Sequence, residues 1–400
     1  MSSSVLQGRG SRWFLPLMAA SGVTMSLTAP LEVLFVREFS HSGAYIGIFM
    51  LSASIGVIVV DVFGTRFVPG LDARAALTVG LFLFGAACIG MGLAPGGTLL
   101  MASRVLQGFG GGVVLGAGLQ AAVRIRSSAA VDSLAPSDEL TRSLARFNAA
   151  FLFGGAVGAP GGLLVAGIVD GRAGYQLALV VTGLLALLVA AILAAVLPRL
   201  AAPPGIPRPR IGLPRFAKTP GSAGALVLAM SGDFLRGGVL FTALPLAGAA
   251  REYSTITIMA AIALMSGVEI VVLLVAYQVI RYVGVVAMLT ASLVLGTVCA
   301  TLLAVMPGAP AYLVASALFG VSLAGSTASL PVLVVSQVGD SSVGLAKFRI
   351  SAGIGILGGS VGCAVLGTEV GIAEVFAVIA VALLGSAGLA HVVGRRMAAA

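Results

Sequence analysis

Five ionisable side chains interrupt long apolar segments of the sequence, and their types are ones that can do chemistry. They are Glu32, Arg104, Asp233, Arg236 and Glu269. An Arg or Asp at the centre of a membrane-spanning helix costs about 2.5–3.5 kcal/mol, so such residues usually face a protein interior and mark ion or substrate pathways. We therefore expect these groups to exchange protons or to contact a bound solute.

The spacing of three of these residues predicts two different roles. Asp233 and Arg236 are three positions apart, so they share one face of a helix and can form an ion pair. That pair either fixes helix packing or exchanges partners as the surrounding cavity alternates. Glu269 has no cation at a matching spacing on its own segment. It is therefore the leading candidate for a group that takes up and releases protons.

The other two ionisable residues are Arg104 and Glu32. A fixed positive charge at Arg104 would alter the proton affinity of a neighbouring acid, or it could simply hold backbone carbonyls. Glu32 lies near the end of its segment, just after Pro30, and is either a partly wetted gate residue or a surface charge. Three acids against two bases leave one negative charge, which a proton or a cationic solute could neutralise.

Helices in a lipid bilayer must position these residues. Of 400 residues, 59% are hydrophobic and 9% are charged, whereas soluble proteins carry about 25% charged residues. Roughly 20 apolar residues span the hydrocarbon core as a helix, and backbone exposed to lipid must be hydrogen-bonded within its own segment. We predict an all-α membrane protein with transmembrane helices at 13–36, 43–62, 74–94, 97–123, 145–169, 174–197, 222–249, 255–280, 284–306, 309–335, 344–367 and 370–393.

The basic residues predict the orientation of these twelve helices. If both termini are cytoplasmic, most of the 23 Lys and Arg residues fall on the cytoplasmic side, and only Arg37, Arg172 and Arg251 fall outside. Cytoplasmic loops are enriched in Lys and Arg, so we expect both termini inside, in a bacterial inner membrane. The net charge of +9 is spread over short breaks between apolar runs, which argues against nucleic-acid binding.

A basic, proline-rich stretch divides the predicted helices into two groups of six. The predicted parts are an N-terminal six-helix bundle, a cytoplasmic linker and a C-terminal six-helix bundle at 1–198, 199–220 and 221–400. LFGGAVGA at 152–159 matches ILGGSVGC at 356–363, and VREFS at 36–40 matches AREYS at 250–254. Both matches pair the helices that a six-plus-six duplication requires. The linker could alternatively bind anionic lipid headgroups.

Three motifs in the N-terminal half resemble those of the major facilitator superfamily. RVLQGFGGG at 104–112 resembles its motif B. Motif A is matched by Asp61, Gly64 and Arg66, and a degenerate motif C by Gly155, Ala159, Pro160, Gly161 and Gly162. The resemblance implies two pseudo-symmetric six-helix bundles, proton coupling through Arg104, a motif A gate that stabilises the outward-facing state, and antiport associated with motif C.

Each of the last two motifs also has a simpler interpretation. Asp61 could contact the positive N-terminal end of the helix at 344–367, or it could be an ordinary charge in a solvated loop. Pro160 removes a backbone donor and lets its helix bend, or the glycines around it could serve only for close helix packing.

Together these features predict proton-coupled efflux of drugs or small amphiphilic metabolites by alternating access. The predicted proton-coupling residues are Glu269, Asp233, Arg104 and Glu32, and the predicted cavity residues are Arg104, Gln107, Arg236 and Glu269. The alternatives are a proton-coupled nutrient symporter and a flippase-like partner in lipid or envelope assembly.

We expect no enzymatic activity, no cofactor beyond the proton gradient, and a monomer that binds a small-molecule substrate within the lipid bilayer. The three cysteines, Cys88, Cys299 and Cys363, lie singly inside apolar runs, which does not suit a metal site.

Overall fold

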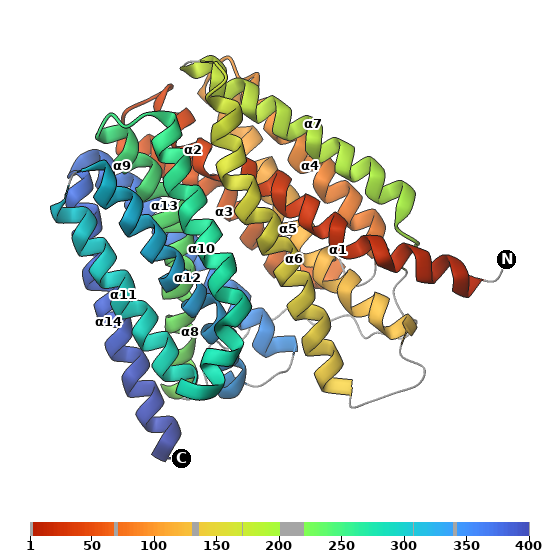
Figure 1. Ribbon diagram of the computed structural model, residues 1–400. Helices are drawn as coiled ribbons and strands as arrows, with labels where there is room; N and C mark the ends of the chain where they lie inside the picture. The colour runs from red at the N-terminus through yellow and green to blue at the C-terminus, as the bar shows by residue number, and fades with distance from the viewer. Residues whose placement is uncertain are drawn as a thin grey trace. The chain divides into compact units, whose positions relative to one another are not determined.

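The computed structural model describes the backbone of residues 3–67, 71–129, 136–169, 171–200, 220–306, 308–338 and 342–399. Within these ranges the chain is helical, and Figure 1 shows the arrangement of the helices within each part of the chain. The elements are α1 (Ser3–Leu27), α2 (Ala29–Arg37), α3 (Gly43–Phe67), α4 (Ala73–Gly92), α5 (Gly97–Ala129), α6 (Pro136–Ala166), α7 (Arg172–Val196), α8 (Pro220–Phe234), η2 (Leu235–Ala243), α9 (Leu244–Ala250), α10 (Thr255–Val283), α11 (Val285–Val305), α12 (Ala309–Val338), α13 (Ser342–Glu369) and α14 (Ile372–Ala399).

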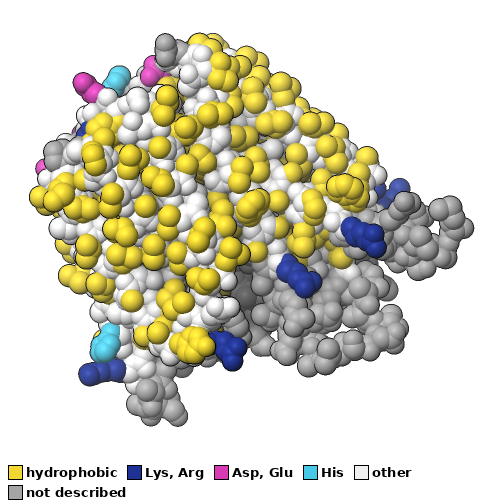
Figure 2. All heavy atoms as spheres, in the orientation of Figure 1, with side chains coloured by type: hydrophobic (Ala, Val, Ile, Leu, Met, Phe, Trp, Pro, Cys, Tyr) yellow, Lys and Arg dark blue, Asp and Glu magenta, His cyan; other side chains and the backbone are white. Residues whose placement is uncertain are grey.

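The helices are long and apolar enough to cross a membrane, which confirms the all-α fold class. In the described part of the chain there are eleven such spans, together with a shorter apolar helix at Gly43–Val57. Together they correspond to the twelve predicted segments. Hydrophobic side chains cover most of the face seen in Figure 2, and the charged side chains lie at its margins. Such a surface fits lipid rather than water as the surrounding solvent.

Two of the spans are not continuous α-helices. The first bends at Thr28, between α1 and α2. Pro30 lies just after this bend and has no backbone N–H to continue the α-helical hydrogen bonds. The span at Ser222–Ala250 contains the π-helical segment η2 between α8 and α9. A sequence pattern of apolar residues predicts the length of a span but not these local departures.

Two side-chain hydrogen bonds support η2, one within it and one just after its C-terminal end. Thr242 Oγ1 donates to the carbonyl oxygen of Gly237 at 2.9 Å, five residues earlier. The hydroxyl of Tyr312, from α12, donates to the carbonyl oxygen of Leu244 at 2.8 Å. Single π-helical turns inside α-helices are rare and are often found at functional sites, so η2 indicates where the C-terminal half could carry its function.

The contacts divide the chain into two compact units. Unit 1 contains Met1–Ala29 and Ser52–Leu213, and unit 2 contains Pro30–Leu51 and Pro214–Ala400. Unit 2 therefore includes α2 and the first turns of α3, which the sequence assigns to the N-terminal bundle. The predicted division into bundles 1–198 and 221–400 stays a prediction, and most of the linker 199–220 lies outside the described residues.

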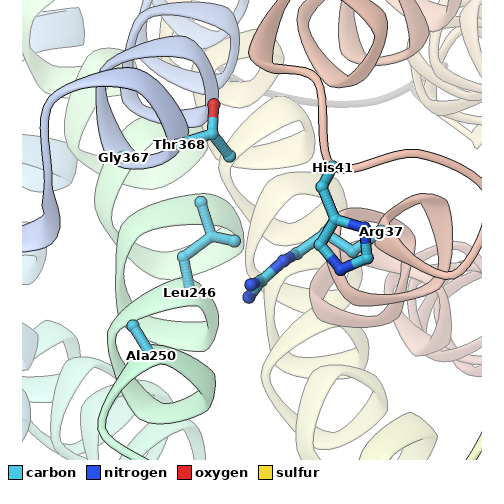
Figure 3. Close-up of a pocket in the computed structure, with 6 residues that line it drawn as sticks. All are labelled: Arg37, His41, Leu246, Ala250, Gly367 and Thr368. Carbon is cyan, nitrogen blue, oxygen red and sulfur yellow. The ribbon is translucent and has the colours of Figure 1, made fainter.

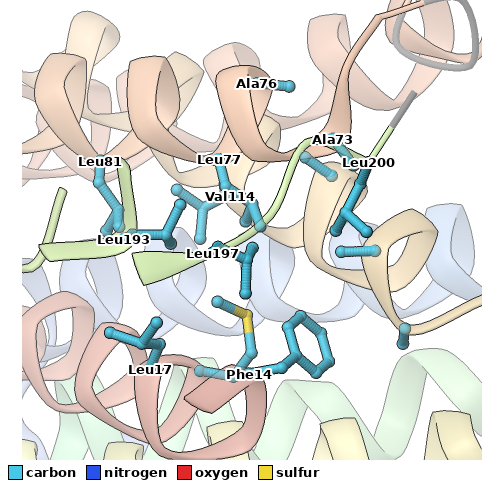
Figure 4. Close-up of a cluster of buried hydrophobic side chains, with 14 of the residues drawn as sticks. Phe14, Leu17, Ala73, Ala76, Leu77, Leu81, Val114, Leu193, Leu197 and Leu200 are labelled. Carbon is cyan, nitrogen blue, oxygen red and sulfur yellow. The ribbon is translucent and has the colours of Figure 1, made fainter. Parts of the chain in front are cut away.

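The core of unit 1 forms where α1, α4, α5 and α7 meet. Figure 4 shows this cluster, whose labelled members are Phe14, Leu17, Ala73, Ala76, Leu77, Leu81, Val114, Leu193, Leu197 and Leu200. Asp72 caps the N-terminus of α4 by accepting from the backbone N–H of Arg74 at 2.8 Å and of Leu200 at 3.2 Å. The cap therefore joins the chain after α7 to the start of α4 and closes the cluster at that end.

Glycines determine how closely α6 packs against α1. A Cβ atom added at three positions of α6 would lie 1.8–2.2 Å from a carbonyl oxygen of α1. The glycines are Gly154, Gly158 and Gly162, and the carbonyl groups belong to Ala19, Val23 and Leu27. The four-residue spacing places all three glycines on one face of α6, which is the small-residue packing expected for helices in lipid.

Candidate functional site

Unit 2 contains a charged centre formed by three helical elements. Arg236 Nη2, from η2, lies 2.5 Å from Glu269 Oε1 on α10. The same nitrogen donates to Thr327 Oγ1 on α12 at 3.3 Å, and Thr327 Oγ1 lies 3.5 Å from Glu269 Oε1. The Glu269 side chain is 5% exposed and that of Arg236 is 16% exposed. A charge-assisted bond of this kind is among the strongest that side chains form in proteins.

The partner of Arg236 differs from the one that the spacing suggested. The expected Asp233–Arg236 ion pair is not formed in the described structure, because the guanidinium group extends across to Glu269 on α10. Arg236 lies in the π-helical segment, whose wider turn changes the alignment of side chains three positions apart. Asp233 nevertheless interacts electrostatically with both Arg236 and Glu269. With both acids ionised, the centre carries a net charge of −1.

Three buried serine hydroxyls lie close in sequence to this centre. Ser266 is one turn before Glu269 on α10, and Ser326 and Ser329 flank Thr327 on α12. Each is at most 1% exposed, and within the described structure none of the three hydroxyls has a hydrogen-bond partner. Sequence reasoning missed them because serine is common in tightly packed membrane helices. They could donate to a bound solute or water.

Unit 1 contains a second polar centre around α5. Arg104 Nη1 donates to Gln107 Oε1, and Gln107 Nε2 donates to Thr28 Oγ1 at 3.1 Å and approaches Cys88 Sγ at 3.6 Å. Arg104 is 6% exposed and Gln107 is 3% exposed. The structure thus brings together the two polar residues of the RVLQG motif, and it adds Thr28 and Cys88, which the motif alone does not identify.

Thr28 and Thr242 occupy matching places in the two halves. The dipeptide Thr-Ala occurs at 28–29 and at 242–243, with the same spacing to the VREFS and AREYS sequences. Thr28 lies at the bend between α1 and α2, and Thr242 lies in η2. The first span of each half is therefore distorted near the same position, although by a bend in one and a π-helix in the other.

The remaining predicted residues have different surroundings. Glu32 is 6% exposed and lies in the first turn of α2, so the alternative of a surface charge is wrong. Its position suits the positive N-terminal end of that helix. Asp61, Gly64 and Arg66 belong to the last turns of α3, but their side chains lie outside the described residues.

The motif C residues lie on and beside the face of α6 that contacts α1. Gly162 is one of the three glycines packed against the α1 backbone, whereas Gly154 and Gly158 are not motif positions. Cβ positions at Gly155 and Gly161 lie 3.0 Å from Ser26 Oγ and 3.3 Å from a Leu27 methyl group. Ala159 is 1% exposed, and Pro160 lies inside α6.

A small cavity lies in unit 2, away from the charged centre in sequence. Its volume is about 180 Å³, and it is lined by Arg37, His41, Leu246, Ala250, Gly367 and Thr368. In Figure 3 the Arg37 and His41 side chains lie on one side, and α9 and α13 form the other. Nearby, Glu369 Oε1 accepts a hydrogen bond from the Gly43 backbone N–H at 3.0 Å, at the start of α3.

Among the described residues, there is no group of three or more His, Cys, Asp or Glu side chains that could hold a metal ion. The carboxylate, guanidinium and hydroxyl groups of the charged centre can transfer protons and bind charged or polar solutes. Glu269, Arg104 and Gln107 are buried among the helices, whereas Arg236 is partly exposed.

Several solved structures share the fold of the whole chain. A bacterial homolog of the human lysosomal transporter Spinster, inward-facing and unoccupied, has a TM-score of 0.72 and 11% identity, covering 98% of this chain and 96% of that one. The human organic anion transporter MFSD10 (TETRAN) has a TM-score of 0.66 and 15% identity, covering 98% and 100%. The nucleoside transporter NupG has a TM-score of 0.65 and 13% identity, covering 98% of each chain.

A comparison with curated protein sequences gives no match. The sequence model of the Major Facilitator Superfamily, in contrast, matches residues 14–365. That match spans most of the chain and agrees with the helical spans and with the similar structures, which are transporters rather than enzymes. The chain therefore belongs to the major facilitator superfamily and is a multi-pass membrane transport protein.

Proposed function

We propose that this transporter is a proton-coupled exporter of drugs or small amphiphilic metabolites in a bacterial inner membrane. It works as a monomer and uses the proton gradient, without a cofactor. The observation that supports this proposal best is the buried Arg236–Glu269 ion pair with Asp233 beside it. One cation cannot neutralise two acids, and a buried net charge is costly, so this centre favours the uptake of one further positive charge.

A proton supplies that charge when it binds to a Glu269 carboxylate oxygen. The neutral carboxylic acid holds Arg236 less strongly, which leaves Asp233 as the remaining anion near the guanidinium group. Loss of the proton restores the Arg236–Glu269 pair. Arg236 thus exchanges partners as the site gains and loses a proton. In an alternating-access cycle the two events take place on opposite sides of the membrane.

Export follows if solute and proton compete for the same carboxylates. A cationic or amphiphilic solute can neutralise the net charge of −1 in place of a proton, while apolar side chains of the surrounding helices contact its hydrophobic part. Either a proton or a cationic solute neutralises the net charge of −1, whereas both together would leave the centre with a net positive charge. The proton and the solute therefore bind alternately and are not transported together. The inward proton gradient then drives the solute outward.

Proton transfer is testable with the substitution Glu269→Gln, which keeps the shape of the side chain and removes its titration. In everted membrane vesicles an imposed pH gradient should drive uptake of ethidium, or of a solute found by comparing metabolites in cells with and without the protein. We expect the variant to lose at least about 90% of gradient-driven uptake, because exchange requires a carboxylate that releases its proton.

The control variant is Glu252→Gln, which alters an exposed acid outside the centre. It should transport like the unmodified protein. Full gradient-driven transport by Glu269→Gln would show that another group carries the proton. If dissipating the pH gradient leaves solute movement unchanged, proton coupling is wrong altogether and a flippase-like role gains support. A fall in the intracellular solute when the gene is deleted would instead favour the nutrient symporter.

A further inference from the structure

The three arginines expected on the outer side of the membrane differ in what they contact. Arg172 Nη2 donates to the carbonyl oxygen of Ala94, just after α4, at 3.4 Å. Arg251 Nη2 donates to the carbonyl oxygen of Leu303, in the last turn of α11, at 2.5 Å. Each of these two cations therefore satisfies the C-terminal end of a neighbouring helix, where carbonyl groups lack helical partners.

Arg37 is the exception among the three. It is the repeat counterpart of Arg251, because VREFS at 36–40 matches AREYS at 250–254. Within the described residues, however, Arg37 makes no hydrogen bond or ion pair, and it lines the cavity instead. Its guanidinium group thus keeps all five N–H donors available for a ligand.

The walls of the cavity combine hydrogen-bond donors with an apolar surface. His41 lies four residues after Arg37, between the end of α2 and the start of α3, and its imidazole can donate a hydrogen bond whether neutral or protonated. Leu246 and Ala250, from α9, form the apolar wall. Thr368 Oγ1 lies 3.0 Å from the carbonyl oxygens of both Ala364 and Val365, so its single proton is already engaged. Figure 3 shows the Arg37 and His41 side chains together, facing Leu246.

Two acids lie next to the cavity residues in sequence and oppose an anion there. Glu38 follows Arg37 but is exposed to solvent. Glu369 follows Thr368, but its Oε1 accepts from Gly43 at the N-terminus of α3, where the helix dipole favours a negative charge. Neither acid is among the residues that line the cavity.

We propose that this cavity binds a small oxyanion, a carboxylate or a phosphate, through Arg37 and His41. Guanidinium groups bind both anions through two parallel N–H···O bonds. A volume of about 180 Å³ holds about six water molecules at roughly 30 Å³ each, which suits one anionic group with a short apolar tail against Leu246 and Ala250. The anion is either a free solute or the headgroup of an anionic lipid. This site is separate from the proposed proton centre at Glu269.

Binding can be measured by isothermal titration calorimetry on the full chain in a neutral detergent, with benzoate and inorganic phosphate as probes. We expect the unmodified protein to bind both anions and Arg37→Gln to bind them at least 10-fold more weakly. Leu246→Ala should weaken benzoate but not phosphate. Arg172→Gln is the matched control and should bind both like the unmodified protein.

Two further experiments distinguish a lipid headgroup from a free anion and provide a test in case Arg37→Gln does not fold. In nanodiscs, competition between phosphatidylglycerol and benzoate identifies a lipid headgroup as the occupant, and its absence identifies a free anion. His41→Gln changes an exposed residue and should weaken binding severalfold even if Arg37→Gln fails to fold. The proposal is wrong if neither probe nor phosphatidylglycerol binds, or if Arg37→Gln and His41→Gln both bind like the unmodified protein.

Discussion

Arg236 interacts electrostatically with two acids, and its interaction with one of them is stronger. The direct ion pair is with Glu269, from a different helix, and Asp233 interacts at longer range. This difference is important because partner exchange requires a strong ion pair, Arg236–Glu269, that can break, and a second acid, Asp233, with which Arg236 can then pair. Three residues with two acids can meet that requirement, whereas one isolated ion pair cannot.

A double-mutant cycle tests this ranking directly. Arg236→Met leaves Glu269 buried without its partner, and breaking a buried pair in this way costs about 3–5 kcal/mol. The thermal unfolding temperature in detergent should therefore fall markedly, and the added substitution Glu269→Gln should restore part of the loss. Coupling between positions 236 and 269 should exceed coupling between 233 and 236.

The comparison cycle uses Asp233→Asn in place of Glu269→Gln. This variant removes the longer-range attraction but leaves the direct pair intact, so its own effect should be small. A larger coupling between Asp233 and Arg236 than between Arg236 and Glu269 would contradict the described geometry and restore the pairing suggested by sequence spacing.

Glycines in these helices fall into two classes that the sequence does not separate. On α13, a Cβ at Gly355 would lie 2.1 Å from the Met230 carbonyl oxygen of α8, whereas a Cβ at Gly358 would meet no heavy atom within 4 Å. Gly355 is therefore required for the contact between α13 and α8. Gly358 belongs to the repeat ILGGSVGC but has no such role in the described structure.

Alanine substitutions at these two glycines form a matched pair on one helix. Gly355→Ala should lower the unfolding temperature by several degrees, because α13 and α8 must move apart to admit the methyl group. Gly358→Ala should leave it unchanged or raise it, since Ala is favoured over Gly in a helix by about 0.5–1 kcal/mol. Equal effects of the two substitutions would show that close backbone contact at Gly355 does not stabilise the protein.

At the scale of the whole molecule, most of the fold could be predicted from the sequence. Backbone groups in lipid must be hydrogen-bonded to one another, and an apolar run of about 20 residues meets this requirement within itself as a helix, so runs of that length identify the spans. The described helices agree with the predicted segments to within a few residues at most ends. The bend at Thr28 and the π-helix at 235–243 could not be predicted, because they change the local hydrogen bonding without changing the hydropathy.

The candidate sites were predictable only in part, for a related reason. The free-energy cost of placing an ionisable side chain within a membrane-spanning helix was enough to identify Glu269, Arg236 and Arg104 as unusual. Which side chains meet depends on contacts between helices far apart in sequence, such as Arg236 with Glu269 or Gln107 with Thr28. Arg37 had no signal of its own, because its sequence context closely matches that of Arg251, and only the structure separates their roles.

The π-helical segment η2 contains Arg236 and begins two residues after Asp233, which lies near the end of α8. A π-helix has hydrogen bonds between residues five apart, whereas an α-helix has them between residues four apart. If η2 became α-helical, one of its residues would therefore join the α-helix that precedes or follows it. That helix would then turn by about 100° and shift by about 1.5 Å along its axis. We predict that such a change of register accompanies proton binding at Glu269.

Spin labels at Val227 on α8 and Val271 on α10, both exposed, would report the turn as a pH-dependent change in their separation. Glu269→Gln should fix one distance at all pH values, and an unchanged distance in the unmodified protein would count against the register change. If the change occurs, binding of a single proton causes a helix to rotate. The segment η2, which contains the charged residue Arg236, then also produces the movement.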